Sequence, residues 1–219
     1  MGVTEGYQEF VTDKWALAAD LGQSNDPTAI CVMQHRVVER GHWREGLTKV
    51  SEHFDVRHLQ RLPLGLSYLD QVAEVRRLLA RPPLRDGCKF TIDSTGVGRA
   101  VGDLFNDAGM SPTQVTITAG NEQTRVDHYR WHVPKAVLIS ILDARLHLGE
   151  LRFAAALSEA GAMADELKDF QRKVSAAGRS TWEARVGSHD DLVLSCALAL
   201  WSFVGKPNPS MVTVPTDWY

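Results

Sequence analysis

Four aspartates in this chain stand where apolar segments end or begin, which is an unusual place for buried charge. Asp20 closes the apolar run 15–20, and Asp93 closes the run 88–92. Asp190 and Asp191 open the apolar segment that ends near residue 203. If the first and fourth predicted strands are parallel neighbours, their carboxyl ends lie about 5 Å apart, the spacing of adjacent strands. Open α/β sheets place their functional sites at this edge.

A cluster of carboxylates at one point needs a cation, because the negative charges repel one another. Hard oxygen ligands suit Mg²⁺ or Mn²⁺, which keep several waters and accept phosphate oxygens. Two such ions about 4 Å apart can activate a water and stabilise the leaving oxygen in phosphodiester cleavage. Each site also has a simpler interpretation: Asp93 as a turn or capping residue, and Asp190 as the cap of the last helix. The coincidence of all of them favours a metal site with Asp20, Asp93, Asp190 and Asp191 as catalytic residues.

The elements around these aspartates begin as strands. The runs 15–20 and 28–33 are short and apolar, and Asp26-Pro27 marks a turn between them. Extended sequence follows at 37–43 and 49–59 without an intervening helical period. The short connections predict an antiparallel three-strand meander.

Helices alternate with strands in the rest of the chain. Apolar residues repeat every three or four positions from residue 68 to 79, where Pro82-Pro83 follows. We predict an α/β fold, a mixed sheet with helices on both faces, within one domain at 14–204. A leader or boundary segment (1–13) and a flexible tail (205–219) would flank that domain. The further expected elements are strands 88–92, 114–118 and 181–186 and helices 98–108, 135–148 (with Pro134 in its first turn), 158 to about 173 (capped by Ser158) and 190–203.

Composition bounds the class of protein. The chain has 219 residues, of which 44% are hydrophobic and 23% charged, enough for a proper core. The three cysteines are too scattered for a disulfide framework, and no signal peptide or membrane span is evident, so we expect a soluble intracellular protein. The net charge of -3 counts mildly against DNA binding. Basic residues gather at 76–89 and 171–187, for which solvated faces are the simpler interpretation.

Three segments resemble the nuclease motifs of phage large terminase subunits. The first is Asp20-Leu-Gly-Gln-Ser-Asn-Asp26, the second Phe90-Thr-Ile-Asp93-Ser-Thr-Gly, and the third Gly187-Ser-His-Asp190-Asp191. Val133-Pro-Lys135 and the segment from Gly178 to Trp182-Glu-Ala are also similar, so the resemblance covers residues 15–204. It implies an RNase H-like fold, related to the RuvC resolvases, and cutting of concatemeric viral DNA during packaging. It also implies a terminase ATPase domain, a small terminase subunit and a portal as partners, in the cytoplasm of an infected bacterial host.

By this resemblance Asp20, Asp93 and one acid of the Asp190-Asp191 pair bind two divalent ions. Which member of the pair faces the ions stays open. Asp26 is a candidate auxiliary ligand, and its place before Pro27 suits a turn equally well. His189 would hydrogen-bond a ligand, contact DNA or hold the start of the last helix.

Other basic residues are candidates for contacts with double-stranded DNA. Lys135 can reach the scissile phosphate or the acidic cluster, with a plain surface lysine as the alternative. Around the predicted hairpin lie the residues that we expect at the DNA backbone, Arg172, Lys173, Arg179 and Arg185. Phosphate contacts of this kind give binding that is sensitive to salt and independent of sequence. No GxxxxGK[ST] phosphate loop occurs, so the packaging ATPase cannot be assigned to these residues.

Three rival interpretations remain. A RuvC-like Holliday junction resolvase uses a similar acidic site, but would prefer four-way junctions to linear duplex. Asp20-Leu-Gly-Gln-Ser and Asp93-Ser-Thr-Gly also resemble, faintly, the phosphate loops of actin-like ATPases and sugar kinases, which would make this a nucleotide-binding module. A catalytically silent DNA-binding or assembly module is the third. Nucleotide binding without DNA cleavage would favour the second.

Overall fold

The computed structural model describes residues 8–22, 26–42, 46–96, 98–169, 171–174, 180–183 and 190–206. They form an eight-stranded mixed sheet in the order β6-β7-β5-β4-β1-β2-β3-β8 and a separate two-stranded hairpin, β9 with β10. The strands are β1 (Gln8–Asp20), β2 (Ala29–His42), β3 (Gly46–Arg61), β4 (Lys89–Asp93), β5 (Thr113–Thr118), β6 (Thr124–Arg125), β7 (Arg130–Pro134), β8 (Leu151–Phe153), β9 (Gln171–Val174) and β10 (Ser180–Glu183). The helices are α1 (Tyr68–Leu79), the 3-10 turn η1 (Leu84–Asp86), α2 (Gly98–Asp107), α3 (Lys135–His147), α4 (Ala160–Asp169) and α5 (Asp191–Val204).

The predicted meander and the parallel pairing beside it are both present. β1 pairs antiparallel with β2, and β2 pairs antiparallel with β3. β1 also pairs in parallel with β4, with Ala19 opposite Ile92. The last residues of these two strands, Asp20 and Asp93, therefore reach the same edge of the sheet.

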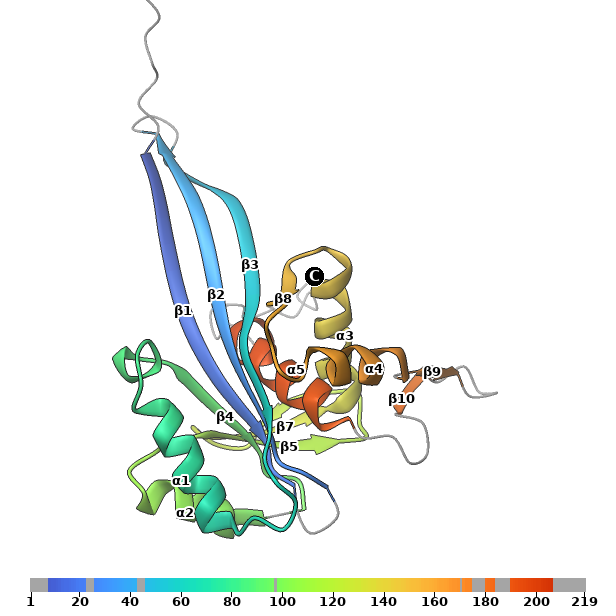
Figure 1. The fold of residues 1–219 in the computed structure, drawn as a ribbon. Coiled ribbons are helices and arrows are strands. Elements are labelled where there is room, and N and C mark those ends of the chain that lie inside the picture. The colour runs from blue at the N-terminus through green and yellow to red at the C-terminus, as the bar shows by residue number, and fades with distance from the viewer. Residues whose placement is uncertain are drawn as a thin grey trace, which may run out of the picture.

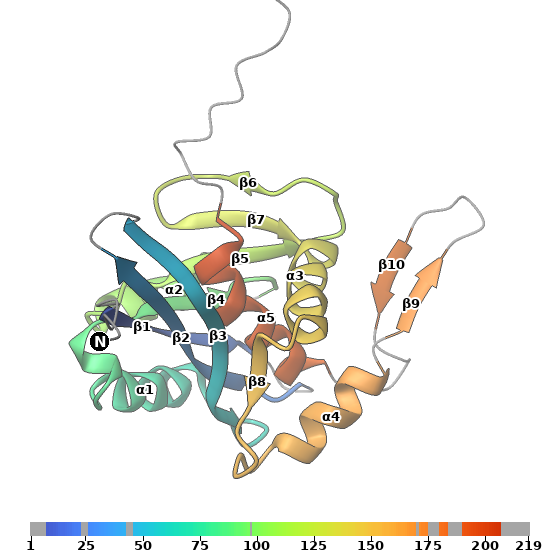
Figure 2. The same ribbon diagram turned by 90° about the horizontal axis from the view of Figure 1, so that it is seen from above.

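Helices cover both faces of the sheet, with α1 and α2 on one side and α3, α4 and α5 on the other (Figures 1 and 2). The alternation along β1 explains the two cores, because successive side chains of a strand point to opposite faces. Leu17 packs with the α1 and α2 side, whereas Ala16 and Ala18 pack with α5. The small alanines let α5 lie close to the sheet, and α5 is buried along its length from Asp191 to Ser202.

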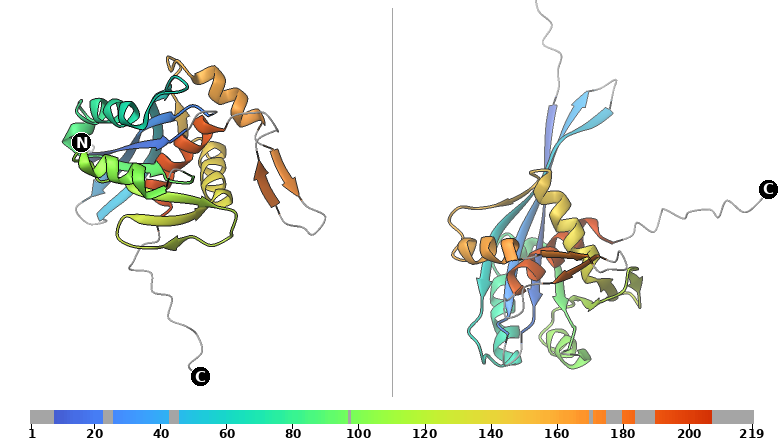
Figure 3. Two further views of the ribbon diagram at one scale, coloured as in Figure 1. Left: turned by 90° about the horizontal axis from the view of Figure 1, so that it is seen from below. Right: turned by 90° about the vertical axis from the view of Figure 1, so that its right-hand side faces the viewer.

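The three strands of the meander extend well past the rest of the sheet. β4 pairs with β1 only over residues 16–19, and β8 pairs with β3 only over residues 54–56. The distal parts of β1, β2 and β3 therefore form an arm that projects from the body (Figures 1 and 3). β1 begins at Gln8, so residues 8–13 belong to this arm. Within the described ranges, no helix is long and apolar enough to cross a membrane.

The region after residue 118 differs most from the expected elements. The helix expected to reach about residue 173 ends at Asp169, because residues 171–174 pair across a hairpin with 180–183 instead. Ser158 does not cap this helix, since its hydroxyl donates to the Leu59 carbonyl at 3.4 Å. The segment before Pro134, for which no strand was expected, is strand β7, in which Trp131 and Val133 are buried and His132 between them is exposed.

Candidate metal centre

Asp20 and Asp93 meet at the carboxyl edge of the sheet, as the parallel pairing requires. Asp93 is 8% exposed, and the Thr95 backbone N–H donates to its Oδ1 at 2.7 Å. Asp20 is partly exposed and interacts directly with Asp93. The Thr95 contact fixes the Asp93 side chain over the turn that follows β4, a turn that includes Gly96 with a φ of 77°.

The site concentrates negative charge in a poorly hydrated place. Burial raises the pKa of Asp20 well above its usual value, and the nearby carboxylates of Asp93, Asp190 and Asp191 raise it further. Burial also raises the pKa of Asp93, against the hydrogen bonds from Thr95 that lower it. For Asp20, the contribution of the neighbouring carboxylates is the repulsion expected of negative charges packed together.

The third acidic position lies at the start of α5, where two cations hold its two side chains. Lys135, the first residue of α3, donates from Nζ to Asp190 Oδ2 at 2.5 Å. Arg61, the last residue of β3, donates from Nε to Asp191 Oδ2 at 2.7 Å. Asp191 is 6% exposed and Asp190 is only partly buried, so the two members of the pair have different surroundings.

Glu166 of α4 is a further acidic residue beside this site. It is 6% exposed, accepts a hydrogen bond from Arg61, and accepts another at 3.0 Å from the backbone N–H of Val193. Burial raises the pKa of Glu166 to about 7. Sequence reasoning missed it because it stands in an ordinary polar helix pattern with no motif. The available signal was its partner Arg61. Arg61 pairs with Ala29 in the meander, which brings a cation to the end of β1.

Hydrogen bonds connect Gly22, just after β1, to Thr28 and to α1. The Gly22 N–H donates to Thr28 Oγ1 at 2.9 Å, and Thr28 Oγ1 donates to Gln71 Oε1 of α1 at 2.8 Å. A Cβ on Gly22 would lie 2.0 Å from the Asp26 carbonyl oxygen, so only glycine permits this fold-back. The backbone of Asp26 is thereby held near the end of β1, while the residue itself is exposed.

The structure thus brings together Asp20, Asp93, Asp190, Asp191 and Lys135. Within the described ranges, no three His, Cys, Asp or Glu side chains already stand as ligands around one point. His189, Arg179 and Arg185 lie outside the described residues, and for Arg172 and Lys173 the structure describes the β9 backbone alone.

The arrangement of sheet and helices is similar to that of several solved viral structures. The large terminase nuclease from thermophilic phage G20c with bound magnesium is similar at a TM-score of 0.59 and 22% identity, over 86% of this chain and 80% of that chain. The Thermus phage P74-26 large terminase nuclease domain is similar at 0.58 and 20%, over 90% and 82%. The human cytomegalovirus terminase nuclease domain follows at 0.52 and 9%, over 88% and 84%.

This chain therefore has an RNase H-like fold, as the sequence resemblance implied. More narrowly, its fold is similar to that of the nuclease domains of large terminases, the family that the sequence resembles. No protein-family model and no curated protein sequence matches the chain.

Proposed function

We propose that this chain is a metal-dependent DNA endonuclease domain that cuts concatemeric viral DNA during genome packaging. One observation carries the proposal: Asp20 and Asp93 end adjacent parallel strands, and the Asp190-Asp191 pair opens a buried helix at the same place. The fold likeness to terminase nuclease domains supports it, and the G20c nuclease is known with bound magnesium and with bound cobalt.

The residues present fit a divalent cation. They offer carboxylate oxygens, the ligands that Mg²⁺ and Mn²⁺ prefer, and a cation would relieve the repulsion that, after burial, raises the pKa of Asp20. Asp20, Asp93 and the Asp190-Asp191 pair would hold two ions, with Asp26 as a further candidate ligand. Such ions supply an activated water and stabilise the leaving oxygen of a phosphodiester.

The other residues of the site would position these carboxylates and the substrate. Arg61 orients Asp191 and neutralises it together with Glu166. Lys135 holds Asp190 and carries a positive charge to the place where a phosphate would arrive. Arg172, Lys173, Arg179 and Arg185 would bind the DNA backbone next to the site, and His189 would support a ligand or contact DNA. We place this domain with a terminase ATPase domain, a small terminase subunit and a portal in the cytoplasm of the infected host.

Plasmid cleavage tests the proposal directly. Supercoiled plasmid is incubated with the protein in Mg²⁺, Mn²⁺ or EDTA, and Asp20→Asn and Asp93→Asn are compared with Asp103→Asn, an exposed aspartate of α2. We expect nicking and linearisation with metal, lost by about a hundredfold or more in the first two variants because about 3 kcal/mol of transition-state stabilisation disappears. Asp103→Asn should cut like the wild type.

Calorimetric titration with Mn²⁺ separates the possible failures. A folded protein that binds Mn²⁺ through Asp20 and Asp93 but cuts no DNA would limit the activity to the complete terminase. No Mn²⁺ binding at millimolar concentration would refute the metal site itself. Faster cutting of four-way junctions than of linear duplex would instead indicate a junction resolvase.

A further inference from the structure

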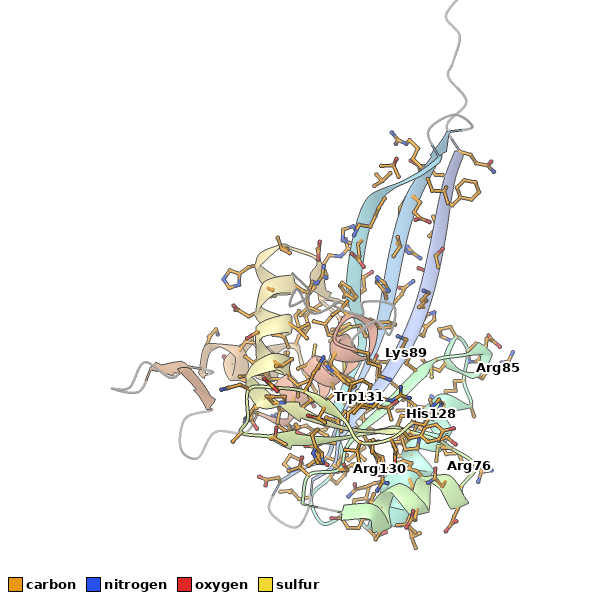
Figure 4. All side chains as sticks on the ribbon, turned by 180° about the vertical axis from the view of Figure 1, so that it is seen from behind. Arg76, Arg85, Lys89, His128, Arg130 and Trp131 are labelled. Carbon is orange, nitrogen blue, oxygen red and sulfur yellow. The ribbon has the colours of Figure 1, made fainter. Side chains whose placement is uncertain are left out.

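Four cations gather where the arm leaves the body, at the end of α5 opposite to the acidic cluster. They come from four different elements or their ends: Lys14 of β1, Lys89 of β4, Arg125 of β6 and Lys206 just after α5. We call these four residues the cationic surface. Figure 4 shows Lys89 at the foot of the arm, with Trp131 of β7 near it in this view.

Two of the four are seated on the end of α5. Lys89 Nζ donates to the Ser202 carbonyl at 2.6 Å and lies 5.2 Å from the centre of the Phe203 ring. Lys206 Nζ lies 5.5 Å from the Trp201 ring and donates to Thr113 Oγ1 at 3.1 Å. Cations at a helix C-terminus are stabilised by its dipole, and this explains the position of both residues.

The dipole of α5 does not explain the positions of the other two residues, Lys14 and Arg125. The Arg125 guanidinium lies 5.8 Å from the Trp131 ring, which packs edge-on against Trp201 with 5.6 Å between the ring centres. Lys14 stands two residues before Ala16, which pairs with Lys89 across the parallel strands. Lys14 and Arg125 are both exposed. The contact between Trp131 and Trp201 therefore connects Arg125 to Lys206.

None of the four has a carboxylate partner among the described residues. Glu52, on the same face of the arm, is hydrogen-bonded to His35 and Lys49. Asp127 forms an ion pair with Arg130. Burial, and then the nearby charges of Lys206 and Lys14, lower the pKa of Lys89. The fold therefore holds mutually repelling cations together, whereas most other exposed arginines in the described part of the chain are paired with carboxylates.

We propose that the cationic surface binds the sugar–phosphate backbone of the duplex DNA on which the acidic site acts. This inference rests on the proposed function, which supplies the polyanion. Phosphate contacts need only cations, whereas protein partners are gripped through exposed aromatic and aliphatic anchors. The rings here are not available as anchors, since Trp131 is 8% and Trp201 0% exposed. Attraction between the duplex and these cations would also offset the electrostatic repulsion between DNA and the acidic cluster.

The test compares two double variants that remove the same charge. Lys14→Gln/Arg125→Gln removes the two exposed members of the surface. Arg77→Gln/Arg152→Gln removes two exposed arginines that are paired with Glu74 and Asp55. The affinity for a fluorescein-labelled 40-bp duplex is measured by anisotropy in EDTA from 50 to 200 mM salt, and the midpoint of thermal unfolding confirms that each variant is folded.

We expect the first variant to lower the slope of log K against log salt by about 2, which is about 0.9 for each lost phosphate contact. At 50 mM salt its affinity should fall about tenfold more than at 200 mM. The control should bind within twofold of the wild type. Equal binding by both variants, with metal-dependent cutting intact, would overturn the cationic surface and leave the nuclease proposal standing. Wild-type protein that binds poly-glutamate but no duplex would also overturn it, in favour of an acidic protein partner.

Discussion

The two ends of α5 carry opposite charge and deal with it in opposite ways. At the N-terminal end, Asp190 and Asp191 are each met by a cation from another element. At the C-terminal end, Lys89 and Lys206 are met by carbonyl, hydroxyl and ring contacts and by no described carboxylate. Both sets complement the helix dipole, so the dipole alone does not explain the difference. Cations of the same chain partly neutralise the acidic end, whereas the positive charge of the basic end remains available to an external anion.

Removal of Arg61, at the acidic end of α5, should cause the largest loss of stability. Arg61→Ala leaves two carboxylates, of Asp191 and Glu166, buried without their shared cation. Loss of one partner from a largely buried ion pair costs about 3 kcal/mol, which in a chain of this size lowers the unfolding midpoint by about 9 °C. Differential scanning calorimetry measures the midpoint directly.

A second substitution identifies the cause. Adding Glu166→Gln to Arg61→Ala removes one of the facing carboxylates, and about 1 kcal/mol of the lost stability should return. If the double variant is no more stable than Arg61→Ala alone, the loss arises from packing of the arginine stem and the network does not neutralise this end of the helix.

Lys135 offers a milder change at the same end. Lys135→Met removes the cation bound to Asp190, and the pair is partly exposed, so at most about 1 kcal/mol is involved. Because Lys135 repels any ion that the carboxylates bind, we expect Mn²⁺ affinity to rise about three- to fivefold by calorimetric titration. Lys168→Met, at an exposed pair with Asp165, is the control and should change nothing. Weaker Mn²⁺ binding in Lys135→Met would mean that the lysine orders the ligands instead of competing with the ion.

Small effects on stability are expected at the basic end, and the smallest of all at Lys14. Lys89→Met removes the hydrogen bond to the Ser202 carbonyl and one favourable charge at the helix terminus, and should cost about 1 kcal/mol in urea unfolding. Lys14→Met, with no such contact, should change stability by less than about 0.5 kcal/mol. Equal losses of stability in both variants would show that the contacts of Lys89 with the end of α5 do not contribute, and that only the charges matter.

The apolar pattern predicted the fold where local and tertiary preferences agree. The meander, α1 and the strand–helix alternation through β5 follow from periods of two and 3.6 residues. The pattern failed at β9, where residues that continue a helical period pair across a hairpin instead, and at β7, whose signal is only Trp131 and Val133 around His132. The structure of such short segments depends on which distant strand they pair with. The local pattern of a single sequence does not reveal that partner.

The acidic set was predictable because parallel strands must bring Asp20 and Asp93 to one edge. Arg61 and Glu166 were not, since their meeting depends on how α4 packs beside β3, and nothing in their own neighbourhoods marks them. The cationic surface was invisible for the same reason: each of its four members stands 36 to 81 positions from the next in the sequence. The basic stretch at 76–89, conspicuous in sequence, contributes only Lys89.

The burial of α5 has a consequence for the geometry of cutting. Fourteen residues of α-helix span about 20 Å, which equals about six base-pair steps of DNA. Because Asp191 to Ser202 are packed on all sides, this spacer cannot slide or stretch without repacking the core. The helix would therefore work as a ruler between the point that holds the duplex and the point that cuts it. Ends that extend less than about six base pairs from the scissile phosphate could not reach both.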